Sequence, residues 1–179
     1  MIYSLLKKLS NCMEYLAALA LILMMLHVLM DVLGRHLINM PAPATTEIVA
    51  YYYMVAAVFL PLPFVELKDK AIVVDLFFNM FSPIWKRIAQ GIGTLLGVVF
   101  FAALAMKSST DALAAYEKGE MIDGLYQVMI WPARFGLPVS FALTALILSY
   151  RFVTETILGL SFVDEDEEDE HRLVEEGIE

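Results

Sequence analysis

Five ionisable side chains lie within or beside apolar stretches of the sequence, where a charge needs a specific reason to be present: Glu14, His27, Asp31, Arg35 and Glu47. A charged group at membrane depth costs roughly 2.5–3.5 kcal/mol on insertion scales. Residues that persist there often couple protons, ligate cofactors or contact partner subunits. These five side chains are therefore the first candidates for chemistry.

Glu14 and His27, at the start of and inside the first apolar stretch, each have a structural interpretation beside a functional one. Glu14 could serve a self-sufficient four-helix proton-coupled exporter, but it follows Asn11-Cys-Met13 at the edge of the apolar stretch, which favours a solvated residue. His27 could ligate haem in the membrane anchor of a respiratory enzyme. No second axial ligand accompanies it in the apolar stretches, which favours a hydrogen-bonded packing residue. Both functions stay open as alternatives.

The remaining three candidates lie at the ends of apolar stretches. Asp31 and Arg35 are four residues apart, and this spacing places them on one helix face, where they can pair. An ion pair at the headgroup level and a contact with a partner protein explain this pair equally well. Glu47 opens the second apolar stretch, and an acid is favourable at a helix N-terminus.

The composition excludes several function classes. One cysteine and three histidines make a zinc centre improbable. The sequence contains no phosphate-binding glycine loop, no Ser/His/Asp set and no paired carboxylates within the apolar stretches, so we predict no enzyme and no cofactor. The formal charge of −9 arises from ten acids beyond residue 163, and nucleic-acid binding would instead need clustered bases.

The apolar content predicts an all-α integral membrane protein. Hydrophobic residues make up 60% of the 179-residue chain and charged residues only 18%, more apolar surface than a soluble core of this size could bury. Four stretches have the length of a membrane-spanning helix. We predict a membrane domain over residues 1–163 and a disordered acidic tail over residues 164–179, with spans at about 13–33, 46–65, 86–106 and 134–157.

The distribution of bases predicts that both termini face the cytoplasm, because cytoplasmic segments are enriched in Lys and Arg. One side of the membrane receives the dense set Lys7, Lys8, Lys68, Lys70, Lys86 and Arg87. The other side receives a sparser set that acids dilute: Arg35, Lys107, Lys118 and Arg134.

The connections and one glycine pair give further local predictions. Pro41-Ala-Pro43 should break the chain after the first span, and Thr45 or Thr46 should cap the next helix. A helix should continue past the membrane over Ser108–Lys118, and the apolar segment Leu125–Trp131 should lie along the interface or dip into it. The sequence Gly93-Thr-Leu-Leu-Gly97 places two glycines four residues apart, a spacing that lets another helix of this chain or of another subunit approach closely.

Several of these features together resemble the small membrane subunit, the DctQ-like family, of tripartite ATP-independent periplasmic (TRAP) transporters. The similarity covers roughly residues 6–162. It rests on Asp31-Val-Leu-Gly-Arg35, on Glu47 opening the second span, and on the charged loop Glu66-Leu-Lys-Asp-Lys-Ala-Ile-Val-Val-Asp75, in which Ala71 replaces the usual His.

The resemblance implies a multi-pass protein of the bacterial inner membrane with two protein partners. A periplasmic substrate-binding protein delivers an organic acid, such as a carboxylate, and a large permease subunit moves it with sodium ions. The small subunit would bind no cofactor and would brace the large one within membrane lipid. Candidate interface or structural residues are Asp31, Arg35 and Glu47 at the outer face, Lys68, Asp69 and Asp75 at the inner face, and Gly93 and Gly97 between them.

Overall fold

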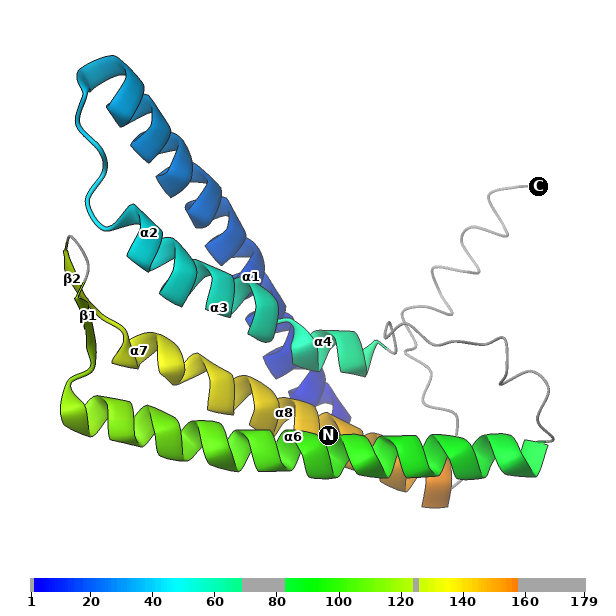
Figure 1. Cartoon of the computed structure of the whole chain (residues 1–179). Helices are drawn as coiled ribbons and strands as arrows, with labels where there is room; N and C mark the ends of the chain where they lie inside the picture. Colours follow the sequence, from blue (N-terminus) through cyan, green and yellow to red (C-terminus); the bar gives the residue numbers. More distant parts are fainter. Residues whose placement is uncertain (1, 69–82, 124–125, 158–179) are drawn as a thin grey trace, which may run out of the picture.

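The computed structural model describes residues 2–68, 83–123 and 126–157, which form helices and one short ribbon (Figure 1). The elements are α1 (Ile2–Leu33), the π-helical turn η1 (Gly34–Ile38), α2 (Thr45–Ile48), the π-helical turn η2 (Val49–Tyr53), α3 (Met54–Phe59), α4 (Leu62–Leu67), α6 (Pro83–Lys118), β1 (Met121–Asp123), β2 (Gln127–Met129), α7 (Trp131–Arg134), α8 (Gly136–Arg151) and the π-helical turn η3 (Phe152–Ile157).

Four helical stretches are long and apolar enough to cross a membrane: Tyr3–Ile38, Thr45–Leu67, Ile84–Lys118 and Trp131–Glu155. This confirms the predicted all-α fold class with four candidate spans. The first and third stretches extend well beyond the predicted spans, and the third includes the predicted continuation over Ser108–Lys118. The predicted acidic tail lies outside the described residues.

The helices form two arms that diverge from a common base (Figure 1). One arm pairs α1 with the segment α2 to α4, and the other pairs α6 with α7 and α8. The arms meet where α4 packs against α8. They separate toward the end that carries residues 34–44, 119–123 and 126–130, which we call the ribbon end. The other end, with residues 2–10, 68, 83–87 and 151–157, is the opposite end.

One stripe of α1 faces the rest of the chain. It comprises Leu6, Ser10, Met13, Ala17, Ala20, Met24, His27 and Asp31, at alternating steps of four and three residues. This repeat of about 3.5 residues keeps a single seam against a neighbouring helix. The small side chains of Ala17 and Ala20 allow close approach. Most other large apolar side chains of α1, such as Leu5, Leu16 and Met25, are exposed, which suits a helix surrounded by lipid or by another subunit.

The best-buried helix is α8, and the core gathers around it near the opposite end. Ile147 and Leu143 of α8 contact Leu6 and Met13 of α1 and Leu67 of α4. On its other side α8 packs along α6, where Phe101 and Phe141 bring their ring centroids within 6.1 Å. The helices α1, α4 and α6 therefore each touch α8, which explains why the arms share one base.

A proline in α4 leaves a carbonyl group that α8 satisfies. Pro63 has no N–H, so the carbonyl of Phe59, four residues earlier, has lost its usual helical donor. The hydroxyl of Ser140, which is fully buried in α8, donates a hydrogen bond to this carbonyl. An unsatisfied backbone group is costly in lipid, so this bond compensates the break at Pro61-Leu-Pro63.

We expect Ser140→Ala to destabilise the chain by about 1 kcal/mol, the typical value of an interhelical hydrogen bond in a membrane protein. Ser149→Ala is the matched control, because among the described residues the Ser149 hydroxyl bonds to Ala145 of its own helix alone, at 2.7 Å. Reversible unfolding in mixed micelles measures both. Equal effects of the two substitutions would show that Ser140 contributes nothing across the helices.

A left-handed glycine ends α6 and begins the ribbon. Gly119 has φ +58°, and the amides of Gly119 and Glu120 bond to the carbonyls of Tyr116 and Ala115 at 3.0 and 2.9 Å. This is the Schellman pattern of a helix C-terminus. The chain then forms the antiparallel pair β1–β2, with Met121 opposite Met129. Within the segment Leu125–Trp131, residues 127–129 pair as a strand, and its expected place along the membrane interface or dipping into it stays a prediction.

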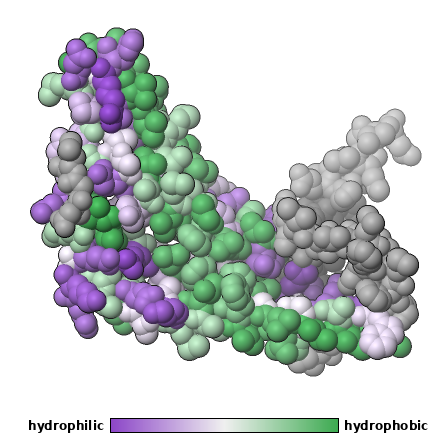
Figure 2. Space-filling view, in the orientation of Figure 1, coloured by the Kyte–Doolittle hydropathy of each residue, from purple (hydrophilic) through white to green (hydrophobic). Residues whose placement is uncertain are grey.

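Much of the apolar surface of the helices is exposed. Figure 2 shows hydrophobic surface along the helices and hydrophilic residues gathered at the ribbon end. Among the side chains exposed by 55% or more are Met25, Met30, Ile84, Leu96, Val99 and Phe100. Lipid or another subunit must cover this surface, because apolar area of this extent is unfavourable in water.

Candidate subunit-docking site at the ribbon end

The first cluster at the ribbon end centres on the carboxylate of Asp31. Arg35 donates its Nε–H to one carboxylate oxygen at 2.9 Å, so the four-residue spacing does produce an ion pair. The amide of Ala42 donates to the other oxygen at 2.9 Å. Asp31 therefore ties the end of α1 to the loop of residues 39–44. It is only 8% exposed, whereas the Arg35 side chain is 59% exposed and available to a partner.

Gly34 allows the chain to fold back at this point. The amide of Met40 bonds to the Gly34 carbonyl at 3.1 Å, and a Cβ on Gly34 would lie only 2.6 Å from the carbonyl oxygen of Met40. No real side chain could be placed there without moving the backbone. This close approach of the Met40 carbonyl explains why the motif Asp31-Val-Leu-Gly-Arg35 has a glycine at position 34.

The start of α2 differs from the predicted cap. The N-cap residue is Ala44, with φ 56°, and no side chain caps the helix. The hydroxyl of Thr45 instead donates to the carbonyl of Ala42 at 3.2 Å, inside the loop. The prediction that Thr45 or Thr46 caps α2 is therefore wrong. Glu47 does lie in the first turn of α2, half-buried, and forms no hydrogen bond or ion pair within the part of the chain that the structure describes.

A second charged cluster lies at the ribbon end of the other arm. Arg134 of α7 pairs with Glu120 at 2.7 Å, and Ile130 donates its amide to the Glu120 carbonyl at 3.1 Å. These contacts join the two ends of the ribbon. One further contact links the arms, since the Tyr52 hydroxyl of η2 donates to the carbonyl of Met129 in β2.

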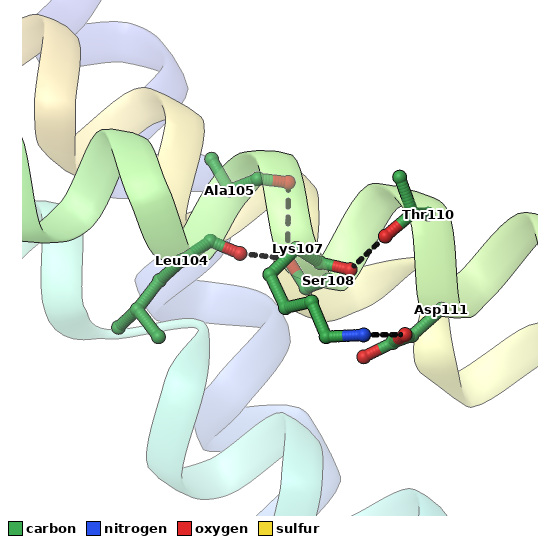
Figure 3. A network of polar contacts seen from close by, with 6 residues as sticks. All are labelled: Leu104, Ala105, Lys107, Ser108, Thr110 and Asp111. Atoms are coloured by element: carbon green, nitrogen blue, oxygen red, sulfur yellow. Dashed lines mark hydrogen bonds and ion pairs between the residues drawn. The ribbon is translucent and has the colours of Figure 1, made fainter.

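The polar surface of α6 begins at Lys107. Figure 3 shows Lys107 paired with Asp111 at 2.6 Å, one turn further along the helix. The hydroxyls of Ser108 and Thr110 donate back to the carbonyls of Leu104 and Lys107, both at 2.7 Å. This local bonding satisfies polar groups where the helix leaves its apolar run, so these residues do not by themselves form a ligand site.

The rings around Trp131 locate the headgroup level on this side. Trp131 lies edge-to-face with Tyr116 at 5.0 Å and with Phe135 at 6.3 Å between ring centroids. Such aromatic groups favour the boundary between hydrocarbon and headgroups. Arg134, three residues after Trp131, therefore also lies close to this boundary.

His27 and Glu14 both lie on α1. His27 lies on the packing stripe of α1, and its ring meets Tyr53 edge-to-face with centroids 5.9 Å apart. Glu14 lies beside the stripe and is half-buried. Within the described residues no group of three or more His, Cys, Asp or Glu side chains could hold a metal ion.

At the opposite end, Lys68 follows α4, with its ammonium 5.7 Å from the ring centroid of Phe64. Asp69 and Asp75, the other candidates of this loop, lie outside the described residues. The structure therefore places Lys68 far from the cluster of Asp31 and Arg35 and does not show what surrounds the rest of the loop.

The two glycines of α6 face different surroundings. A Cβ on Gly97 would lie 3.2 Å from the Leu148 side chain of α8, so Gly97 supports packing within the chain. A Cβ on Gly93 would meet nothing within 4 Å. Gly93 thus leaves a stretch of exposed helix backbone that another helix could approach.

Sequence reasoning missed several residues that organise the site. Gly34, Glu120, Tyr52 and Ser140 all act through contacts that are distant in sequence or that depend on backbone geometry. The glycine inside the Asp31–Arg35 motif and the Lys118-Gly119 helix stop were the two signals that could have revealed the loop and the ribbon.

The fold and the site together define a membrane protein of four helices, with charged clusters at the helix ends and apolar faces left uncovered. Residues 24–157 match the family described as tripartite ATP-independent periplasmic transporters, DctQ component. The match covers most of the chain, from within the first candidate span through the other three, so the chain belongs to this family, as the resemblance predicted. No curated protein and no solved structure matches the chain.

Proposed function

We propose that this chain is the small permease subunit of a TRAP-type secondary transporter and that it braces a large sodium-coupled subunit. The match of residues 24–157 to the DctQ component carries this proposal. The solute would be an organic acid, such as a carboxylate, that a periplasmic binding protein delivers. The sodium ions would bind in the large subunit and not in this one.

The distribution of polar groups supports a bracing role. The buried polar side chains in the described part of the chain are few: Ser10, Asp31, Thr45, Ser140 and Thr144. Those of Ser140 and Thr144 bond to helix carbonyls, and that of Asp31 holds a loop. A pathway for an organic anion would need polar groups spaced along the helices. We therefore assign solute movement to the large subunit.

The exposed backbone at Gly93 supports a docking face on α6. Glycine lets two helices approach closely in lipid, where van der Waals packing drives their association. The large subunit would cover this face, and the exposed Arg35 with Glu47 would contact a partner at the ribbon end. The binding protein would approach from the same end.

We propose that the ribbon end faces the periplasm of a bacterial inner membrane, with the opposite end in the cytoplasm. The test replaces Cys12 by alanine and introduces one cysteine at Lys8 or at Lys118, which are exposed lysines at the two ends. In spheroplasts a membrane-impermeant maleimide should label Lys118→Cys at once and Lys8→Cys only after permeabilisation. The reverse pattern would invert the proposed topology.

Transport in proteoliposomes tests the function. We expect the large subunit to take up an organic acid only when this chain, the loaded binding protein and an inward sodium gradient are all present. Vesicles that contain this chain alone should show no uptake. Full uptake by the large subunit without this chain would contradict the bracing role, and drug efflux that depends on Glu14 would favour the exporter alternative.

A further inference from the structure

A groove between the two arms and a polar cavity share Arg134 at the ribbon end. The groove has a volume of about 230 Å³ and is lined by Tyr51 and Val55 of the first arm and by Ile130, Ala133, Arg134 and Leu137 of the second. All of its lining side chains except Arg134 are aromatic or aliphatic. The lining is almost wholly apolar, so Arg134 borders the groove with its methylene stem, and an occupant must present an apolar chain.

The polar cavity on the other side of Arg134 has a volume of about 280 Å³, and four charged residues line it: Asp111, Lys118, Glu120 and Arg134. Both acids already have basic partners, since Asp111 pairs with Lys107 at 2.6 Å and Glu120 with Arg134 at 2.7 Å. Lys118 is exposed and forms no ion pair in the described ranges. The lining itself has two acids and two bases, and because Lys107 pairs with Asp111 from outside it, Lys118 is the base left over to meet an anion.

The polar cavity and the groove lie at the depths of a lipid headgroup and of its acyl chains. Lys107 is the first charge after the apolar run of α6, and Asp111, one turn beyond it, lines the same cavity as Arg134. With Trp131 beside it, Arg134 lies at the headgroup level. Val55 and Leu137 lie further along their helices toward the hydrocarbon, where lipid is the solvent.

We propose that this chain binds one anionic glycerophospholipid between its arms, with the phosphate on Arg134 and Lys118 and an acyl chain in the groove. The ion pair to Glu120 leaves Arg134 39% exposed, and its guanidinium has more donors than that pair uses. At the ribbon end the two arms are joined by the hydrogen bond from Tyr52 to Met129, and the lipid fills the gap beside this bond. The lipid thereby fixes the angle between the arms.

Fluorescence quenching tests this site. The Trp85→Phe variant leaves Trp131 as the single reporter, and vesicles carry bromine on the acyl chains of either phosphatidylglycerol or phosphatidylcholine at equal content. We expect the relative association constant at Trp131 to favour phosphatidylglycerol by about fivefold, the effect of one base near the headgroups. Arg134→Gln should remove this preference, and Lys118→Gln should reduce it.

Two variants separate lipid binding from structural effects. Glu120→Gln weakens the same ion pair but keeps the cation, so the preference for phosphatidylglycerol should persist or rise. Ala133→Phe fills the groove and should lower quenching by both brominated lipids. Equal association constants in the parent protein, or a preference that survives Arg134→Gln, would overturn the proposal. Loss of the preference in Glu120→Gln to the same extent as in Arg134→Gln would assign Arg134 a purely structural role.

Discussion

Replacing Gly34 by alanine should destabilise the chain by about 1–3 kcal/mol, the range for overpacking at a site that cannot relax freely. The added Cβ would lie 2.6 Å from the backbone carbonyl oxygen of Met40, and no side-chain rotation can move either atom away, because the Cβ is bonded directly to the backbone. The loop of residues 39–44 must then shift. The hydrogen bond from Ala42 to Asp31 should be lost with it.

Gly136→Ala is the matched control, because a Cβ at Gly136 meets nothing within 4 Å and the residue lies in α8. Alanine there should be neutral or should stabilise by up to about 1 kcal/mol through the unfolded chain. Unfolding in mixed micelles, followed by circular dichroism, measures both variants. A Gly34→Ala protein as stable as its Gly136→Ala counterpart would show that the motif does not need its glycine for this turn.

Leucine at Gly93 and at Gly97 should have opposite consequences. At Gly97 even a Cβ would lie 3.2 Å from Leu148, so leucine should force α6 and α8 apart and destabilise the isolated chain by about 1–3 kcal/mol. At Gly93 a Cβ would meet no described atom within 4 Å, so the isolated protein should keep or gain stability. The bulk at Gly93 should instead weaken association with the large subunit, by a similar free energy.

Two measurements on the same pair of variants separate these effects. The free energy of unfolding of the isolated chain should fall for Gly97→Leu and not for Gly93→Leu. The amount of large subunit recovered with the tagged chain should fall for Gly93→Leu although its stability is unchanged. Normal recovery of the large subunit with Gly93→Leu would place the docking face elsewhere on the molecule.

The sequence predicted the features that depend on local composition. The lengths of the apolar stretches fixed the number of helices, because a bilayer requires about 20 apolar residues for each span. The spacing of Asp31 and Arg35 predicted their ion pair, since residues four apart on a helix are neighbours. The continuation of α6 to Lys118 was also predicted from the local sequence Ser108–Lys118.

Features that depend on distant contacts or on backbone conformation could not be predicted in the same way. The hydroxyl of Ser140 bonds to Phe59 across 81 positions, and its role appears only once α8 lies against the break at Pro63. The ribbon was missed because three-residue strands carry almost no periodicity. The prediction that Thr45 or Thr46 caps α2 was wrong because the Thr45 hydroxyl bonds within the preceding loop, and Ala44 is the N-cap residue.

Co-purification from native membranes tests the central claim most directly. The tagged chain, solubilised in a mild detergent, should bring with it a large multi-span permease in equal amount, identified by mass spectrometry. Recovery of the chain alone, under conditions in which other membrane complexes of the same cells stay intact, would contradict its assignment as a transporter subunit.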